Sequence, residues 1–170
     1  MLTLLRHLLA ILVLPATAAV FVPLWIARRY QTQPAPPSTL ADWLMTLAGI
    51  TLLGAGLTLF VACLARFATE GRGTLAPWDP PRRLVLRGPY RYVRNPMISG
   101  VTLVLFGEAL VLRSPPHGWW ALAFVAINAV YIPLVEEPQL ENRFGENYRR
   151  YKRHVRRFIP RLHPWSTKGG

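Results

Sequence analysis

The sequence predicts an all-α membrane protein with about four transmembrane helices and a C-terminal amphipathic helix at the membrane interface. Hydrophobic residues make up 52% of the chain, although its net charge is +12. Long uncharged runs alternate with arginine-rich connectors, and this segregation is typical of a protein that crosses the membrane several times. Because 170 residues allow one domain, we treat residues 1–170 as a single membrane domain.

Four uncharged or nearly uncharged runs are the predicted spans. Their bounds are about 8–27, 43–65, 96–112 and 118–135. A span needs roughly 20 apolar residues, with a range of about 17 to 25. The first two runs meet that length, and the two shorter runs fit best as a tight antiparallel hairpin. Because the first run continues to Ala27 and stops at Arg28, we interpret it as a retained span rather than a cleaved signal peptide.

The distribution of basic residues predicts the orientation in the membrane. Of the 20 lysines and arginines, seven lie in the connector 66–94 and nine in the C-terminal segment 136–170. Positive residues mark the cytoplasmic side. We therefore expect a bacterial inner-membrane protein in which both termini, the connector and a C-terminal cap formed by 136–170 are cytoplasmic. The same charge suits anionic lipid headgroups, and because no nucleic-acid-binding motif accompanies it we expect no nucleic-acid partner.

Local signals predict where the later helices begin and end. Asn95 is a suitable N-cap and Pro96 suits the first helical position, so a helix should begin there. The run 136–138, Glu-Glu-Pro, should end the fourth span. Apolar residues at helical spacing then predict one amphipathic helix along the membrane surface, ended by Pro160. These apolar residues are Leu140, Phe144, Tyr148, Tyr151, Val155 and Ile159.

Several residues within the spans receive a structural interpretation. Gly54 and Gly56 resemble the start of a G-x-G-x-x-G loop, but Leu59 stands at the third glycine position inside an apolar run, so we expect close helix packing instead. Glu108 lies towards the outer end of the third span, where we expect a structural partner or a side chain that reaches the interface. Cys63 is the single cysteine, which rules out an intrachain disulfide.

The hairpin predicts where polar residues meet. The third and fourth spans are antiparallel, nearly equal in length and joined by a short turn, so the start of one meets the end of the other. Arg94 and Asn95 should therefore lie level with Glu136 and Glu137 at the cytoplasmic boundary. Paired carboxylates attract a cation or act as a base, and a helix N-terminus presents N–H groups to an anion. S-adenosylmethionine carries a carboxylate, an ammonium and a sulfonium and fits this mixture, as would other zwitterions.

Two runs of sequence resemble the signatures of a known family. The first, 88–100, reads Gly-Pro-Tyr-Arg-Tyr-Val-Arg-Asn-Pro-Met-Ile-Ser-Gly, and the second comprises 136–140, 144–148 and Tyr151. Together they resemble the isoprenylcysteine carboxyl methyltransferase and phospholipid methyltransferase superfamily, with the two signatures in the family's order on either side of one hairpin. The resemblance covers about residues 70–160.

The resemblance implies a membrane methyltransferase with S-adenosylmethionine in a cytoplasm-facing pocket capped by the C-terminal segment. The hairpin geometry and the resemblance together make Glu136, Glu137 and Arg94 the candidate catalytic residues. The expected cofactor-binding residues, with no metal among the ligands, are Tyr90, Tyr92, Asn95, Pro96, Gly100, Glu137, Tyr148 and Tyr151. Many family members have histidine in place of Asn95, and tyrosine often stands in place of Ile98. Asparagine does not titrate near neutral pH, so Asn95 is excluded as a general base.

The sequence leaves the methyl acceptor open between the C-terminal carboxylate of a prenylated cysteine, a phospholipid amine and a small apolar molecule. We expect a lipid-like or prenylated substrate, in the first place as in isoprenylcysteine carboxyl O-methyltransferases. A carboxylate acceptor needs no base but benefits from an orienting cation, such as Arg91, Arg94 or Arg143. A phospholipid amine, as in phosphatidylethanolamine N-methylation, needs a base, and Glu136 or Glu137 is the candidate. A hypothesis of another class is a non-catalytic, lipid-binding membrane scaffold, which would bind no cofactor.

Overall fold

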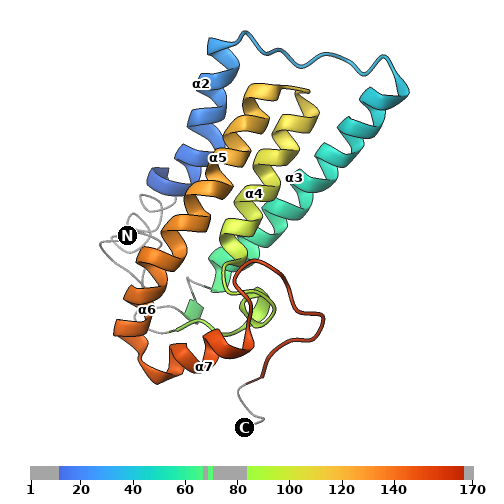
Figure 1. Cartoon of the computed structure of the whole chain (residues 1–170). Helices are drawn as coiled ribbons and strands as arrows, with labels where there is room; N and C mark the ends of the chain where they lie inside the picture. Colours follow the sequence, from blue (N-terminus) through green and yellow to red (C-terminus); the bar gives the residue numbers. More distant parts are fainter. Residues whose placement is uncertain (1–11, 67–68, 71–83, 167–170) are drawn as a thin grey trace.

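The computed structural model describes residues 12–66, 69–70 and 84–166, and the regular secondary structure of those ranges is helical throughout (Figure 1). The all-α prediction is therefore confirmed for the described part of the chain. The elements are η1 (Leu12–Phe21), α2 (Val22–Arg29), α3 (Leu40–Arg66), η3 (Gly88–Arg91), α4 (Pro96–Val111), α5 (Pro115–Tyr131), η4 (Ile132–Glu136), α6 (Glu137–Phe144) and α7 (Glu146–His154).

Helices α3, α4 and α5 run up and down beside one another, with α4 in the middle (Figure 1). Helix α2 packs against α5, and the preceding η1 packs against α4. The core between α4 and α5 is formed by Val101, Leu105 and Ala121, which are at most 5% exposed. Helices α6 and α7 lie at one end of this bundle (Figure 1).

The backbones of α3 and α4 touch at two glycine pairs. A Cβ atom added to Gly56 would lie 2.6 Å from the Gly100 carbonyl oxygen, and one added to Gly49 would lie 2.9 Å from the Gly107 carbonyl oxygen. Small residues permit this close approach of two helices. The packing prediction is thus confirmed for Gly56 and wrong for Gly54, which has open space around it.

Two of the four predicted spans are supported by the length and composition of the observed helices. Within the described residues, Leu40–Arg66 and Pro115–Phe144 are long and apolar enough to cross a membrane, whereas α4 is a shorter apolar helix. Only 17% and 11% of the most apolar stretches of the two long helices are buried inside the protein. Their exposed apolar surface is what a lipid environment would cover. That the chain crosses the membrane four times remains a prediction.

The predicted helix break at 136–138 is wrong, because the helix continues from α5 through η4 into α6, whereas the bounds of the fourth span remain a prediction. A π-type turn, in which the Glu137 N–H donates to the Ile132 carbonyl oxygen, carries the chain through this proline-containing stretch without a break. The helix ends at Gly145, whose φ of 56° and ψ of −132° form a conformation that favours glycine. The rule that proline ends a helix therefore placed the boundary too early.

The predicted amphipathic interfacial helix is also corrected. It consists of two helices, α6 and α7, because Gly145 separates them, and α7 ends at His154 rather than at Pro160. Its apolar face packs on the protein itself rather than on the membrane surface. Tyr148, Tyr151 and Val155, which are 1–3% exposed, contact Leu84, Leu86, Leu140, Phe144 and Trp165. Ile159, predicted on the same face, is 62% exposed.

At the end of the bundle opposite α6 and α7, buried polar contacts join α5 to α2. The His117 ring, 2% exposed, lies 2.7 Å from the Ser114 hydroxyl oxygen and 3.1 Å from the Pro23 carbonyl oxygen, which links α5 to α2. Glu108 in α4 has one carboxylate oxygen that is buried with no hydrogen-bond partner in the described part of the chain. The expected partner is therefore not found for that oxygen. Of the predicted connector 66–94, residues 67–68 and 71–83 lie outside the described residues.

Candidate functional site

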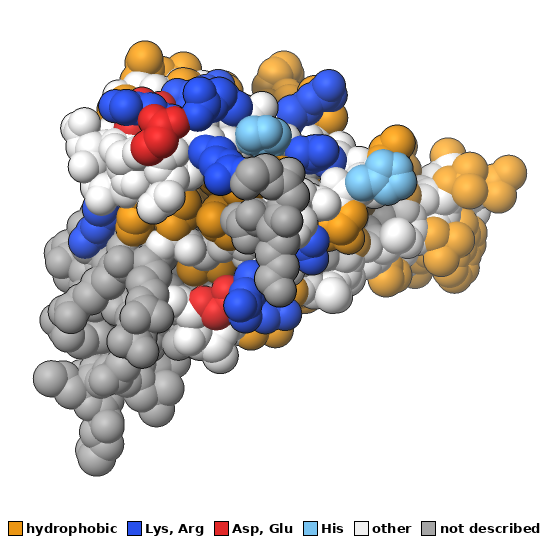
Figure 2. All heavy atoms as spheres, turned by 90° about the horizontal axis from the view of Figure 1, so that it is seen from below, with side chains coloured by type: hydrophobic (Ala, Val, Ile, Leu, Met, Phe, Trp, Pro, Cys, Tyr) orange, Lys and Arg blue, Asp and Glu red, His pale blue; other side chains and the backbone are white. Residues whose placement is uncertain are grey.

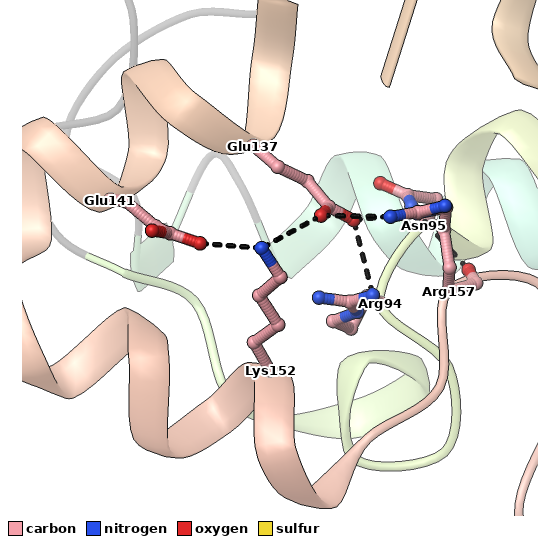
Figure 3. Close-up of polar contacts among 6 residues, drawn as sticks. All are labelled: Arg94, Asn95, Glu137, Glu141, Lys152 and Arg157. Carbon is pink, nitrogen blue, oxygen red and sulfur yellow. Dashed lines mark hydrogen bonds and ion pairs between the residues drawn. The ribbon is translucent and has the colours of Figure 1, made fainter. Parts of the chain in front are cut away.

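Three separate segments meet at the end of the bundle where α4 begins. They are the approach segment (residues 84–95), helices α6 and α7, and the tail (residues 155–166) (Figure 3). The predicted meeting of the hairpin ends is confirmed, because Arg94 Nη2 lies 3.1 Å from Glu137 Oε1. Arg94 lies two residues before α4, and Glu137 lies at the start of α6, which α5 reaches through η4.

Glu137 is the centre of this site. Its carboxylate is 2% exposed and contacts cations from three segments (Figure 3). Arg157 donates through Nε to Oε1 at 2.7 Å and through Nη2 to Oε2 at 3.0 Å, while Lys152 Nζ lies 3.3 Å from Oε2. With Arg94, three positive groups surround one buried carboxylate. Opposite charges at this distance favour the ionised form of an acid, so Glu137 is held charged and is poorly suited to take up a proton.

The same contacts keep the neighbouring cations protonated. The hydrogen bond to Glu141, and then that to Glu137, raises the pKa of Lys152 above its ordinary value. The hydrogen bond to Glu137 raises the pKa of Arg157. Lys152 thus bridges two carboxylates of α6 from its position on α7.

Arg94 is buried, but only part of its hydrogen-bonding capacity is used. Its side chain is 8% exposed, and its backbone N–H donates to the Arg156 carbonyl oxygen at 2.9 Å. Beyond the Nη2 contact with Glu137, its Nε and Nη1 atoms are buried with no hydrogen-bond partner in the described part of the chain. A buried donor without an acceptor costs about 1–3 kcal/mol, and more when it is charged. A carboxylate or phosphate on a ligand would supply the missing acceptors.

Asn95 and Pro96 occupy the start of α4, as predicted, but the asparagine side chain does not cap the helix. Its Nδ2 atom instead donates to the Arg157 carbonyl oxygen at 3.4 Å, which ties the helix start to the tail. Gly100, one turn further along, faces the backbone of α3 at Gly56. The structure thus brings Asn95 to the Glu137 cluster and leaves Gly100 inside a helix interface. Their predicted roles in cofactor binding remain predictions.

Three of the four predicted tyrosines are buried. Tyr90, Tyr148 and Tyr151 are 8%, 3% and 2% exposed, whereas Tyr92 is 38% exposed. The Tyr151 hydroxyl donates to the Tyr90 carbonyl oxygen at 2.7 Å, which fastens α7 to the approach segment. Burial raises the pKa of Tyr90, Tyr148 and Tyr151. Their hydroxyls are therefore neutral hydrogen-bonding groups rather than bases.

The tail runs along the approach segment and covers it. The Arg161 N–H donates to the Tyr92 carbonyl oxygen, and the Trp165 N–H donates to the Arg91 carbonyl oxygen, both at 2.9 Å. Arg91 returns a hydrogen bond from Nε to the Trp165 carbonyl oxygen at 2.6 Å. These paired contacts hold the tail in one register across the entrance to α4.

The candidate orienting cations have different positions. Arg94 reaches the buried carboxylate, and Arg91 is bonded to the tail. Arg143 is exposed, with its guanidinium 6.0 Å from the centre of the Phe144 ring. Glu136, the other candidate base, is half-buried beside the cluster. Only Arg94 among the three arginines therefore lies at the buried site.

Sequence reasoning missed Arg157 and Lys152. Arg157 lies beyond the end of α7, where helical periodicity gives no information about its direction. Lys152 looks like one of several basic residues on the polar face of α7. The spacing of Glu137 and Glu141, one helical turn apart, was the one signal that α6 presents two carboxylates to the same neighbour.

The surface at this end of the molecule is basic and partly hollowed. Figure 2, which views the molecule from this end, shows lysine and arginine side chains gathered on it. An open, mainly apolar hollow of about 340 Å³ lies between the end of α3 and the approach segment. Its lining residues are Ala62, Ala65, Arg66, Thr69, Gly88 and Pro89. A basic surface beside an apolar hollow suits a ligand with an anionic head and an apolar body.

The comparison with known families assigns the chain. The model of the phospholipid methyltransferase family matches residues 44–147, which is more than half of the sequence. The chain belongs to this family. Membership indicates a membrane methyltransferase, and the matched stretch includes Arg94 and Glu137 but ends before Lys152 and Arg157. No curated protein and no solved structure matches the chain.

Proposed function

We propose that this member of the phospholipid methyltransferase family uses S-adenosylmethionine to methylate a lipid-borne acceptor at the end of the bundle occupied by Glu137 and Arg94. The observation that carries the proposal is the pair of buried donors on Arg94, Nε and Nη1, which have no hydrogen-bond partner among the described residues. Buried donors are nearly always hydrogen-bonded to protein, water or a ligand, and an acid group on a ligand would satisfy these two. Family membership supports methyl transfer as the chemistry.

The residues of the site suit the proposed cofactor. When bound, S-adenosylmethionine supplies an electrophilic methyl group on a sulfonium. Arg94 would receive an acid group through Nε and Nη1, and Asn95 lies within the same cluster to donate a further hydrogen bond. Tyr92, the most exposed of the four tyrosines, offers an aromatic face at the entrance. The tail covers the approach segment and would exclude water from the reacting groups.

The state of Glu137 favours an acceptor that needs no base. Because three cations hold its carboxylate, it is a poor proton acceptor. A carboxylate acceptor carries no proton to remove and needs only to be oriented by a cation. We therefore propose O-methylation of a lipid-borne carboxylate, of the isoprenylcysteine type, as the activity.

A second candidate is N-methylation of a phospholipid amine. The description of the matched family favours it. In this reaction a base must remove a proton from the amine, and Glu136 is the remaining carboxylate of the pair. In either case the basic surface supports a cytoplasmic location of this end, with the apolar hollow available to the hydrocarbon part of the substrate.

The chemical stability of the product distinguishes the two activities. The purified protein in lipid nanodiscs is incubated with S-adenosylmethionine labelled in its methyl group, with either an S-farnesylated cysteine whose amine is blocked or phosphatidylethanolamine. Our proposal predicts a product from the farnesylated cysteine that releases labelled methanol in alkali, because it is an ester. An alkali-stable label on phosphatidylethanolamine would identify the second candidate. No transfer and no cofactor binding by folded protein would contradict both and favour a non-catalytic lipid-binding scaffold.

A further inference from the structure

The two arginines at Glu137 share its carboxylate unequally. Arg157 binds both oxygens through Nε and Nη2, in the bidentate arrangement of a strong arginine–carboxylate pair. Arg94 contacts a single oxygen through Nη2 alone, at 3.1 Å. The buried arginine therefore makes the weaker of the two contacts, and the arginine on the tail, whose side chain is 32% exposed, makes the stronger one.

The carboxylate has no capacity left for a second contact with Arg94. An ionised carboxylate offers about four lone-pair positions. Arg157 uses two of them, and Lys152 and Arg94 use one each. The two remaining nitrogens of Arg94 consequently find no acceptor on Glu137, although it is adjacent, and none elsewhere in the described ranges.

We propose that Arg157 is a positioning residue that keeps Arg94 available for an acid group of the ligand. Without the bidentate contact of Arg157, Glu137 would take Arg94 as its bidentate partner, through Nη2 and one of the neighbouring nitrogens. That rearrangement would consume a donor that the ligand needs. The inference rests on the proposed function, because the ligand is either the methyl donor or the acceptor.

The backbone fixes Arg157 in this position. The carbonyl oxygen of the preceding residue, Arg156, accepts the Arg94 backbone N–H at 2.9 Å, and the carbonyl oxygen of Arg157 accepts from Asn95 Nδ2 at 3.4 Å. The tail is therefore bonded to the start of α4 on both sides of the peptide that carries Arg157. Its guanidinium reaches Glu137 from a defined anchor, as a positioning role requires.

Arg94 would recognise a carboxylate or a phosphate, because both anions can accept two hydrogen bonds from the fork of donors on a guanidinium. Two sources exist in the proposed reaction. One is the α-carboxylate of S-adenosylmethionine, and the other is the anionic group of the acceptor lipid. A form of the cofactor without its carboxylate separates them, because it removes only the first source.

The test uses Arg157→Lys in the full-length protein. Lysine keeps the charge but contacts one oxygen as a point charge, so it leaves a position on Glu137 for Arg94. We expect the Kd or KM of the ligand that carries the acid group to rise about tenfold, the size of one lost charge-assisted hydrogen bond, with kcat at saturation retained. Arg153→Lys is the matched control, because Arg153 pairs with Glu146 on the exposed side of α7.

A second substitution separates positioning from simple structural support. Glu137→Gln in the Arg157→Lys protein replaces the carboxylate by an amide with a single acceptor atom, which is unable to take Arg94 bidentately. The positioning role predicts that the double variant binds the ligand more tightly than Arg157→Lys alone. If Arg157 only held the tail in place, removing its partner as well would leave binding unchanged or weaken it further, which would overturn the inference.

The outcomes also distinguish this inference from the proposed function. Wild-type methyl transfer with unchanged Kd and KM in Arg157→Lys would overturn the positioning role and leave the function intact. A wild-type protein that is folded but binds neither ligand would overturn both. If Arg157→Lys weakens S-adenosylmethionine but not its decarboxylated analogue, Arg94 holds the cofactor carboxylate. If instead only the KM of the acceptor rises, Arg94 holds the acceptor.

Discussion

Replacing Gly56 by alanine tests the contact between α3 and α4 on which the position of the site depends. The new Cβ would lie 2.6 Å from the Gly100 carbonyl oxygen and 2.9 Å from two atoms of Val104. The first distance is about 0.8 Å shorter than the 3.4 Å at which ordinary contact begins. Because two of these three atoms are backbone, α4 has to move rather than a side chain. Overpacking of this kind costs about 1–3 kcal/mol.

Gly54→Ala is the matched control, since a Cβ at that position meets nothing within 4 Å. Alanine is favoured over glycine in a helix by about 0.8–1.0 kcal/mol in both variants. Gly54→Ala should therefore be neutral or stabilising, and Gly56→Ala should be less stable than Gly54→Ala by about 1–3 kcal/mol. Unfolding of the two purified proteins in one detergent, followed by circular dichroism, measures this difference. Equal stability of the two variants would refute the close helix contact.

Two further substitutions test how α7 is held. Tyr151→Phe removes the donor to the buried Tyr90 carbonyl oxygen and should lower the free energy of unfolding by about 1–3 kcal/mol. Tyr30→Phe, at an exposed position, should leave it unchanged. Denaturant titration measures the free energy of unfolding of both variants. Gly145→Ala forces a side chain into the backbone conformation of Gly145, with φ of 56° and ψ of −132°, and should destabilise the protein by about 1–3 kcal/mol, whereas Gly118→Ala, with open space around it, should not. Equal melting temperatures for the Gly145 and Gly118 variants would contradict the described break between α6 and α7.

The parts of the fold that follow from length and periodicity could be predicted from the sequence. The start of α4 at Pro96 follows from a residue type favoured before a helix and a proline at the first helical position, although the Asn95 side chain makes no capping bond. The meeting of Arg94 with Glu137 follows from two antiparallel runs of nearly equal length. Both inferences need only local signals and the geometry of a hairpin, so they required no knowledge of side-chain packing.

The errors arise where one local rule competed with another. The proline after Glu137 indicated a helix end, but a π-type turn upstream of it carried the helix on to Phe144. The apolar period across 140–159 indicated one helix, and a single glycine with positive φ interrupted it. A hydrophobic period does not register such a break, because the residues on both sides of Gly145 still face the same core.

The candidate site was predictable in part, for a similar reason. Arg94 and Glu137 flank two antiparallel apolar runs of nearly equal length, whose relative position a hairpin determines. Arg157 reaches the same carboxylate from an extended tail, and its direction depends on backbone hydrogen bonds between the tail and the start of α4. Non-local contacts of that kind leave no periodic signal in the sequence.

The role of Arg94 in binding an acid group is tested most directly by the affinity for S-adenosylmethionine. Calorimetry measures this affinity in the purified wild-type protein and in Arg94→Met. Methionine keeps most of the buried volume but removes both unpartnered donors. If Arg94 receives the acid group of the cofactor, we expect binding by wild type and a loss of affinity of about ten- to a hundredfold in the variant, as for a hydrogen bond to a charged group. If the acceptor supplies the acid group, the same loss appears in the KM of the acceptor. If a folded Arg94→Met protein had the wild-type affinity for S-adenosylmethionine and the wild-type KM for the acceptor, Arg94 would bind neither ligand and the proposed site would be wrong.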